Sequence, residues 1–128
     1  MKSCFTLLLI DIDNFKAFND AYGHQAGDSI IREISKIFRD ASRKIDAVAR
    51  YGGEEFGIIL PITKKEEALI LAERIRRAVE TSPGLKNITI SIGVASFPED
   101  GEKKEDLIAN ADRALYEAKR SGKNKICA

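Results

Sequence analysis

Carboxylate side chains stand at two places where an apolar run meets a turn. Asp11 and Asp13 follow one apolar run, and Glu54 and Glu55 precede another. Magnesium takes one or two protein carboxylates and leaves its other positions to water and phosphate oxygens. If the two strand ends are neighbours, the pattern predicts a hard-cation site with Asp11 and Glu54 as direct ligands. A second interpretation of Asp13 is that it caps the helix that follows it.

Groups that favour an anion lie close to these carboxylates in the sequence. The helix expected after Asp13 begins with free backbone N–H groups, and Lys16 lies one turn further on, an arrangement that suits a triphosphate. Four more cations gather at the end of the last expected helix: Lys119, Arg120, Lys123 and Lys125. Their alternative role is a solvated tail, because cations near a helix C-terminus also interact favourably with the helix dipole.

An expected loop over residues 23–27 adds groups that suit a nucleobase. Asn19 and Asp28 flank this loop and together offer donors and acceptors to a guanine edge. His24 is the only histidine of the chain. Because it has no partner nearby in the sequence, we interpret it as a loop residue rather than a catalytic base.

Length, charge and cysteine content limit the classes of protein to consider. The chain has 128 residues, which suffice for one domain with one core. A net charge of +1 argues against nucleic acid or an anionic membrane as a bulk partner. Cys4 and Cys127 form no metal-spaced cluster, and we expect them to be reduced packing residues. The apolar run 4–10 is shorter than a membrane span, and no signal peptide is evident, so we expect a cytoplasmic protein without membrane contact.

Apolar periodicity predicts the elements that must hold these residues. They are a doubly buried strand over 4–12, a short helix over 14–21, a helix with its apolar stripe over 30–41, a hairpin of strands 47–51 and 56–61, a helix opened by a capping box over 63–66, a strand over 87–97 with one buried face, a helix over 107–118 and a last short strand. Gly52 and Gly53 favour the hairpin because glycine tolerates positive φ.

The order βα(α)ββαβαβ indicates an α/β (α+β) fold with a mixed sheet and helices on both faces. A ferredoxin-like, split βαβ core with an inserted helix and hairpin is the architecture that this order favours.

Four segments together resemble the GGDEF-family diguanylate cyclase domain in its GGEEF variant. "DIDNFKAFNDAYGHQAGD" is similar to the family's nucleotide-binding segment, "RYGGEEF" to its signature, "ITISIGVA" to its late strand and "ADRALYEAKRSGKN" to its final helix. They occur in family order across nearly the whole chain. Residues 1–128 are therefore identified as one such domain.

This resemblance implies a palm-type nucleotidyl cyclase fold and a reaction. Two GTP molecules condense to cyclic di-GMP with release of two pyrophosphates. Because one domain binds one GTP, the resemblance also implies a homodimer with two facing sites. Two magnesium ions, or manganese in their place, would serve each active site.

The resemblance assigns roles to residues of this sequence. The metal ligands would be Asp11, Glu54 and the Ile12 carbonyl. The phosphate ligands would be the Asn14 and Phe15 amides, Lys16, Lys119 and Lys123, where many members have Arg at the position of Lys123. Asn19 and Asp28 would read guanine, His24 would lie close to the nucleotide, and Gly52 and Gly53 would bring backbone close to it. Glu54, or Glu55 beside it, would help to deprotonate the attacking hydroxyl.

A second site is implied by Arg43 and Asp46, which resemble the family's Arg-x-x-Asp product-inhibition motif. Arg74 matches a secondary arginine of that site. Arginine forks to phosphate or stacks on guanine, and the aspartate accepts hydrogen bonds from the base. As a bare pattern, Arg-x-x-Asp also occurs by chance at charged helix ends.

The chain departs from the family pattern at its start. Members usually carry a helix and an Asp-x-Leu-Thr-Gly-Leu-x-Asn-Arg-Arg segment before the first strand, which this chain lacks, and we expect a sensor domain upstream in the full-length protein. This departure leaves a second hypothesis open, a non-catalytic module that binds GTP or cyclic di-GMP. A third hypothesis is an unrelated α/β domain with an accidental motif, which would bind no nucleotide.

Overall fold

The computed structural model describes residues 4–85 and 87–128, and its centre is a five-stranded sheet of order β2-β3-β1-β4-β5. The strands are β1 (Phe5–Ile12), β2 (Ala47–Arg50), β3 (Glu55–Pro61), β4 (Ile90–Phe97) and β5 (Ile126–Cys127). Strand β1 pairs antiparallel with β3 and β4, whereas β5 pairs with β4 in parallel. The predicted mixed strand direction is therefore confirmed.

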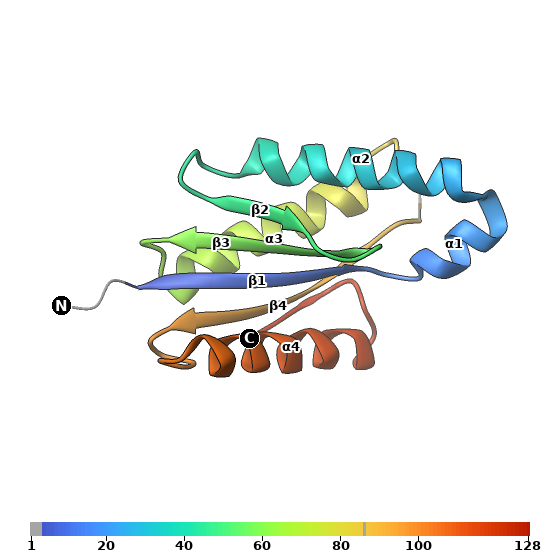
Figure 1. Ribbon diagram of the computed structural model, residues 1–128. Helices are drawn as coiled ribbons and strands as arrows, with labels where there is room; N and C mark the ends of the chain where they lie inside the picture. The colour runs from blue at the N-terminus through green and yellow to red at the C-terminus, as the bar shows by residue number, and fades with distance from the viewer. Residues whose placement is uncertain (1–3, 86) are drawn as a thin grey trace.

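Four helices surround this sheet, three of them over its faces (Figure 1). They are α1 (Phe15–Tyr22), α2 (His24–Ala41), α3 (Lys65–Thr81) and α4 (Lys104–Arg120). Figure 1 shows α2 and α3 over one face and α4 over the other, while α1 lies beyond the end of β1. The predicted order of elements and the helices on both faces are confirmed. In the described part of the chain, no helix has the length and apolar character that crossing a bilayer requires.

Alternation along β1 divides its side chains between two cores. Leu8 and Ile10 belong to the large core shared with α2 and α3, whereas Leu7 and Leu9 pack in a smaller core with α4. Burying each such side chain contributes about 1.5–3 kcal/mol. Asp11 continues the series of Leu7 and Leu9, so it points to the face that α4 covers.

Strand β4 corrects one expectation from the sequence. The prediction of a single buried face was wrong, because every residue of β4 except Phe97 is buried. The small side chains on its second face admit α4 at close range. A Cβ added to Gly93 would lie 2.2 Å from the Ala111 carbonyl oxygen and 2.4 Å from the Leu115 amide nitrogen.

The predicted loop over 23–27 is also wrong, because α2 begins at His24. Only the first of its two glycines breaks a helix: Gly23 has φ 89°, and its N–H donates to the Asn19 carbonyl at the end of α1. Gly27 is buried inside α2, and its N–H donates to the Gly23 carbonyl. The absence of a side chain at Gly27 therefore leaves room for neighbouring atoms and does not serve a turn.

The start of α3 and the hairpin tip differ in detail from their predictions. The capping glutamate is Glu67 rather than Glu66, and it accepts a hydrogen bond from the Lys64 N–H at 3.1 Å. Thr63 is not the cap because its hydroxyl donates to the Pro61 carbonyl instead. Gly52 and Gly53 do not have positive φ, so the hairpin does not use the backbone freedom expected of them.

Candidate functional site

The end of β1 and the hairpin tip bring two carboxyl groups together. In the sheet register Asp11 lies opposite Glu55, and the Ile12 N–H donates to the Glu54 carbonyl oxygen at 3.1 Å. The pKa of Glu54 is raised, first by burial and then by the charge of nearby Asp11. Crowded carboxyl groups of this kind favour a shared proton or a bound cation.

A lysine from the opposite end of the chain completes this cluster. Nζ of Lys119 on α4 lies 3.1 Å from Oδ1 of Asp11, and the charge of Lys119 opposes the rise in the pKa of Glu54. Apart from this ion pair, the buried Oδ1 of Asp11 has no hydrogen-bond partner among the described residues. It therefore keeps lone pairs available for a further ligand.

The start of α1 lies beside the carboxylates and carries the residues assigned to phosphate. Asn14 precedes α1 in a left-handed conformation, with φ 57°. Its Oδ1 accepts a hydrogen bond from Lys123 Nζ at 2.6 Å, which joins the segment after α4 to this helix start. Lys16 is exposed, and Phe15 is buried in the large core.

Asp13 does not cap α1, and this alternative from the sequence is wrong. Its carboxylate is buried and accepts hydrogen bonds from the Thr89 hydroxyl at 2.8 Å, the Ser91 hydroxyl at 2.6 Å and the Asn124 N–H at 2.9 Å. Sequence reasoning missed these partners. The Asp-x-Asp spacing was the one local signal, and it does not point to partners in β4 or after α4.

The residues assigned to the base lie where α1 meets α2. Asn19 is half-buried, and its Oδ1 accepts no hydrogen bond from the described residues. A Cβ added to Gly27 would lie 1.9 Å from this oxygen, so the glycine makes room for the Asn19 side chain. Asp28 and His24 are exposed on α2. An unbonded amide next to an exposed carboxylate is suited to recognise a polar edge.

The two hairpin glycines differ in their surroundings. A Cβ on Gly52 would lie 3.0 Å from Oε1 of Glu55, whereas one on Gly53 would meet no described atom within 4 Å. Space beside Gly53 is therefore open in the domain itself.

An apolar groove of about 660 Å³ lies between α4 and the sheet, lined by residues that include Leu9, Tyr51, Ile59 and Ile108. Glu55 also lines this groove, and the pKa of Tyr51 is raised by burial and by the charge of Glu55. The apolar lining is unsuited to phosphate, so we do not assign the nucleotide to it.

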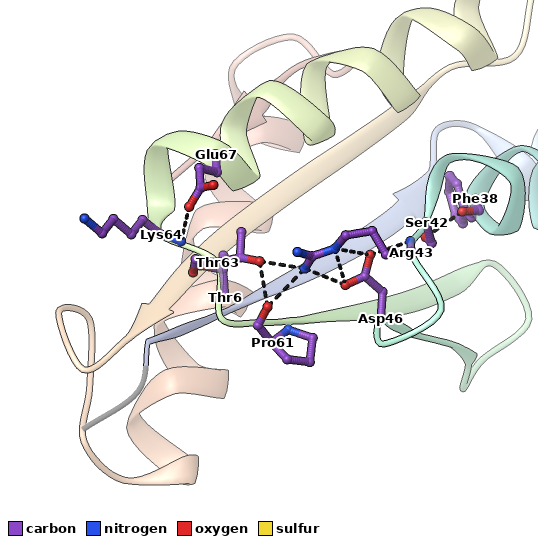
Figure 2. A network of polar contacts seen from close by, with 9 residues as sticks. All are labelled: Thr6, Phe38, Ser42, Arg43, Asp46, Pro61, Thr63, Lys64 and Glu67. Carbon is purple, nitrogen blue, oxygen red and sulfur yellow. Dashed lines mark hydrogen bonds and ion pairs between the residues drawn. The ribbon is translucent and has the colours of Figure 1, made fainter. Parts of the chain in front are cut away.

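Arg43 and Asp46 form a separate polar network, drawn in Figure 2. The Arg43 guanidinium donates to both Asp46 carboxylate oxygens, and its Nη2 also donates to the Pro61 carbonyl at 3.0 Å and the Thr63 hydroxyl at 2.7 Å. The Asp46 side chain is only 1% exposed, whereas that of Arg43 is 52% exposed. The carboxylate thus anchors a cation that remains accessible.

Arg74 of α3 and Arg43 line one small pocket of about 160 Å³, together with Asp46 and Thr63. Thr63 was not singled out from the sequence as part of this site. In the register of β1 and β3, Pro61 lies at the opposite end of the strands from the Asp11 and Glu55 pair. The structure therefore separates the two groups of predicted residues by the length of the sheet.

Comparison with known proteins places this geometry in a family. The family model described as "Diguanylate cyclase, GGDEF domain" matches residues 1–125. Diguanylate cyclase A of Treponema denticola is 46% identical over 98% of this chain and 35% of its own length. The response regulator PleD of Caulobacter vibrioides is 45% identical over 93% of the chain and 28% of its own length. The chain thus spans about a third of these curated relatives.

Solved structures agree with the sequence comparison. The active GGEEF domain of a diguanylate cyclase from Vibrio cholerae superposes with a TM-score of 0.91 and 37% identity, covering 98% of this chain and 82% of that one. The GGDEF domain of DgcB from Caulobacter crescentus, solved in complex with c-di-GMP, has a TM-score of 0.89 and 36% identity, covering 98% and 78%. These matches confirm the predicted fold, and the chain belongs to the GGDEF-domain family of diguanylate cyclases.

Proposed function

We propose that this chain condenses two GTP molecules to cyclic di-GMP and two pyrophosphates. The observation that carries the proposal is the meeting of Asp11, Glu54 and Lys119 beside the start of α1. Acidic and basic groups in one place suit a reaction in which a hydroxyl loses a proton while negative charge develops on phosphate. Family membership and relatives named diguanylate cyclase support the same reaction.

A divalent metal, which the family generally uses, fits the residues at this site. The buried Oδ1 of Asp11, whose one partner among the described residues is Lys119, and the raised pKa of Glu54 are the observations that favour a cation at this site. The described residues hold no group of three or more His, Cys, Asp or Glu side chains suited to a metal. Two carboxylates suit magnesium, because it takes few protein ligands. Asp11, Glu54 and the Ile12 carbonyl would hold up to two ions, which when bound would neutralise phosphate charge.

The protein's own residues supply binding and proton transfer. Lys119 and Lys123 neutralise the β- and γ-phosphates, with the Asn14 and Phe15 amides and Lys16 as further donors. Asn19 and Asp28 hold the guanine, beside His24, and Gly52 and Gly53 let the backbone approach the nucleotide. This arrangement fixes the α-phosphorus next to the carboxylates.

Glu54 takes the proton of the attacking 3′-hydroxyl, with Glu55 supporting it. The new bond joins this oxygen to the α-phosphorus of the second GTP, and the bond to the leaving pyrophosphate breaks. A second identical step closes the ring. Each domain holds one GTP, so two copies must face each other, and a homodimer is part of the proposed mechanism.

Product inhibition at Arg43, Asp46 and Arg74 is the second part of the proposal. The pocket that these residues line offers an accessible guanidinium held by a buried carboxylate. Guanidinium groups bind phosphate and stack on guanine, which a cyclic dinucleotide presents together. The DgcB domain was solved in complex with this dinucleotide, which supports such binding in a relative.

The protein's relatives suggest its context. Since the curated relatives are about three times as long as the matched region and PleD is a response regulator, we propose that an upstream sensor domain controls dimerisation. We assign the reaction to the cytoplasm because GTP is supplied there.

Incubation with GTP and magnesium, followed by chromatography for cyclic di-GMP and pyrophosphate, tests the proposed reaction. The domain should be fused to a dimerising coiled coil, and an Asp11→Asn fusion serves as the inactive control. Product formed by the parent fusion and not by the control supports the proposal. GTP binding without product at dimer-forming concentrations would instead favour a non-catalytic binding module.

A further inference from the structure

The turn that carries Lys123 has a backbone unusual for its residue types. Gly122, Lys123 and Asn124 follow α4 with φ values of 129°, 63° and 50°. Lys123 and Asn124 are consecutive non-glycine residues whose backbones lie in the left-handed region. This conformation costs free energy and persists only where surrounding contacts hold it. The contacts that hold this turn therefore help to set the position of Lys123.

Asp13 holds the backbone of the turn. Its Oδ2 accepts a hydrogen bond from the Asn124 N–H at 2.9 Å, and the residue is only 2% exposed. The hydroxyls of Thr89 and Ser91 fix the same carboxylate at 2.8 Å and 2.6 Å. A carboxylate bound on both oxygens is a rigid anchor, and its charge strengthens each hydrogen bond.

Arg76 of α3 holds the side chain of Asn124. Its Nη1 donates to Asn124 Oδ1 at 2.7 Å, and Asn124 Nδ2 donates to Glu80 Oε2 at 2.6 Å. Glu73 fixes the guanidinium in turn with two hydrogen bonds of 2.8 Å. Asn124 is therefore held from the end of β1 and from α3 at once.

These anchors act next to the proposed phosphate site. Lys123 precedes Asn124, and its Nζ donates to Asn14 Oδ1 at 2.6 Å. Asn14 in turn follows Asp13 in the chain. Asp13 thus joins the turn after α4 to the residues that precede α1. The distance between these two segments determines how far Lys123 reaches over the start of α1.

We propose that Asp13 and Arg76 are positioning residues for the β- and γ-phosphates of GTP. They act through Asn124 and hold the turn so that Lys123 faces the start of α1. The inference rests on the proposed function, in which Lys123 binds these phosphates.

The test compares Asp13→Ala and Arg76→Met with the parent in the dimerised fusion. Each change should raise the KM for GTP roughly tenfold, with a smaller change in kcat. The reason is that the turn is no longer held in place, which weakens the binding of phosphate by Lys123. Asp13→Asn should largely restore the KM, because its amide oxygen still accepts from Asn124 while its NH2 group donates to Ser91. In a Lys123→Ala background neither change should raise the KM further.

A second measurement separates positioning from activity and from folding. Calorimetric titration with 3′-deoxy-GTP, which lacks the attacking hydroxyl, should show the same pattern in Kd. Ile34→Val, in the α2 core and remote from the turn, controls for lost stability and should leave Kd unchanged. If Asp13→Ala does not fold, the raised Kd expected of Arg76→Met and the near-parental Kd expected of Asp13→Asn test the positioning role.

The outcomes distinguish this inference from the function on which it rests. A parent that binds 3′-deoxy-GTP but forms no cyclic di-GMP overturns the proposed reaction, while the Kd values still test positioning. A parental KM and Kd in Arg76→Met, or full additivity with Lys123→Ala, overturns the positioning role.

Discussion

The ammonium group of Lys119 lies 3.1 Å from Oδ1 of Asp11 and joins the end of α4 to the end of β1. The contact places a cation beside a pair of carboxyl groups, since the charge of the same aspartate also raises the pKa of Glu54. Lys119 therefore has two expected effects, one on phosphate and one on the protonation of Glu54.

Lys119→Met should shift the acid limb of the pH profile to higher pH. The pKa of Glu54 is raised by burial and by Asp11, while Lys119 lowers it. Activity needs the ionised carboxylate, so it falls as the pH drops through the raised pKa, and removing the lysine moves that fall upward. We expect kcat/KM also to decrease by about a hundredfold at neutral pH.

The measurement is kcat/KM against pH at fixed free magnesium. Lys104→Met makes the same charge change at the other end of α4 and should leave the acid limb in place, which corrects for the ionisation of GTP itself. An acid limb at the same pH in Lys119→Met and the parent would contradict the coupling.

Glu54→Gln should stabilise the domain without divalent metal while it removes activity. A carboxyl group whose pKa is raised on folding binds its proton more tightly in the folded state. Its contribution to stability is therefore full at low pH and is lost as the pH rises through the raised pKa. At pH 7.5 the neutral amide avoids this loss, so we expect the variant to be more stable than the parent.

Urea unfolding in EDTA at pH 7.5 and pH 4 measures this gain. It should be present at the higher pH and much smaller at the lower one, whereas Glu33→Gln on α2 should show no such difference. A variant less stable than the parent at pH 7.5 would mean that Glu54 has a net favourable partner.

Two kinds of contact differ in how well the sequence predicted them. Contacts that follow from strand pairing were predicted well, whereas contacts that depend on the three-dimensional path of a turn were not. Asp11 and Glu54 stand at ends of apolar strands, and antiparallel pairing of β1 with β3 brings such ends together. Asp13 has the same local pattern as Asp11. Its partners Thr89 and Asn124 lie 76 and 111 residues away, so nothing near Asp13 in the sequence indicates them.

Glycine was the other source of error, because the residue type does not reveal why a side chain is absent. Gly23 breaks a helix, as predicted, whereas Gly27 and Gly93 make room for neighbouring atoms. Local propensity describes the first role. The other two depend on packing between elements, which a single sequence does not display.

Gly27→Ala should impair GTP binding far more than it impairs folding. The new methyl group would displace the Asn19 side chain, whose oxygen lies 1.9 Å from the added Cβ position. The side chain can rotate away, and alanine in a helix gains about 0.5–1 kcal/mol over glycine, so Tm should change little. Losing a guanine contact should raise the KM for GTP roughly tenfold.

Steady-state kinetics and thermal unfolding of Gly27→Ala test these expectations, with Asn19→Ala as the matched variant. Both single changes should raise the KM, and the double variant should be little worse than either, because they remove the same contact. Additive effects would show that Gly27 acts independently of Asn19.

Gly93→Ala should destabilise the domain by about 1–3 kcal/mol or more, because the added methyl group meets backbone atoms of α4 that cannot rotate away. Displacing α4 also moves Lys119 from Asp11, so activity should fall with stability. Gly57→Ala in β3 is the matched control, because Gly57 and Gly93 both pair with Leu9 of the intervening β1 and so lie on the same face of the sheet. Its Cβ would meet Tyr51 and Leu9 at ordinary contact distances of 3.6 Å and 3.8 Å. Urea midpoints that fall equally in both variants would contradict this account of the packing.

Arg43→Ala should relieve product inhibition, but it also removes the main partner of a buried carboxylate. The Asp46 side chain is 1% exposed and would keep the Arg43 backbone N–H as a donor at 2.7 Å. The Tm of Arg43→Ala should therefore fall, and the Arg43→Ala/Asp46→Ala double variant should recover part of that loss because no buried charge is left unpaired.

Arg74 lines the same pocket and is exposed, so Arg74→Ala tests the site without this complication. We expect the inhibition constant of cyclic di-GMP to rise at least about tenfold in all three variants, since each removes a charge-assisted contact. Lys44→Ala is exposed next to Arg43 and should be inhibited like the parent. Unchanged inhibition in Arg74→Ala and in the double variant would place the inhibitory site elsewhere on the domain.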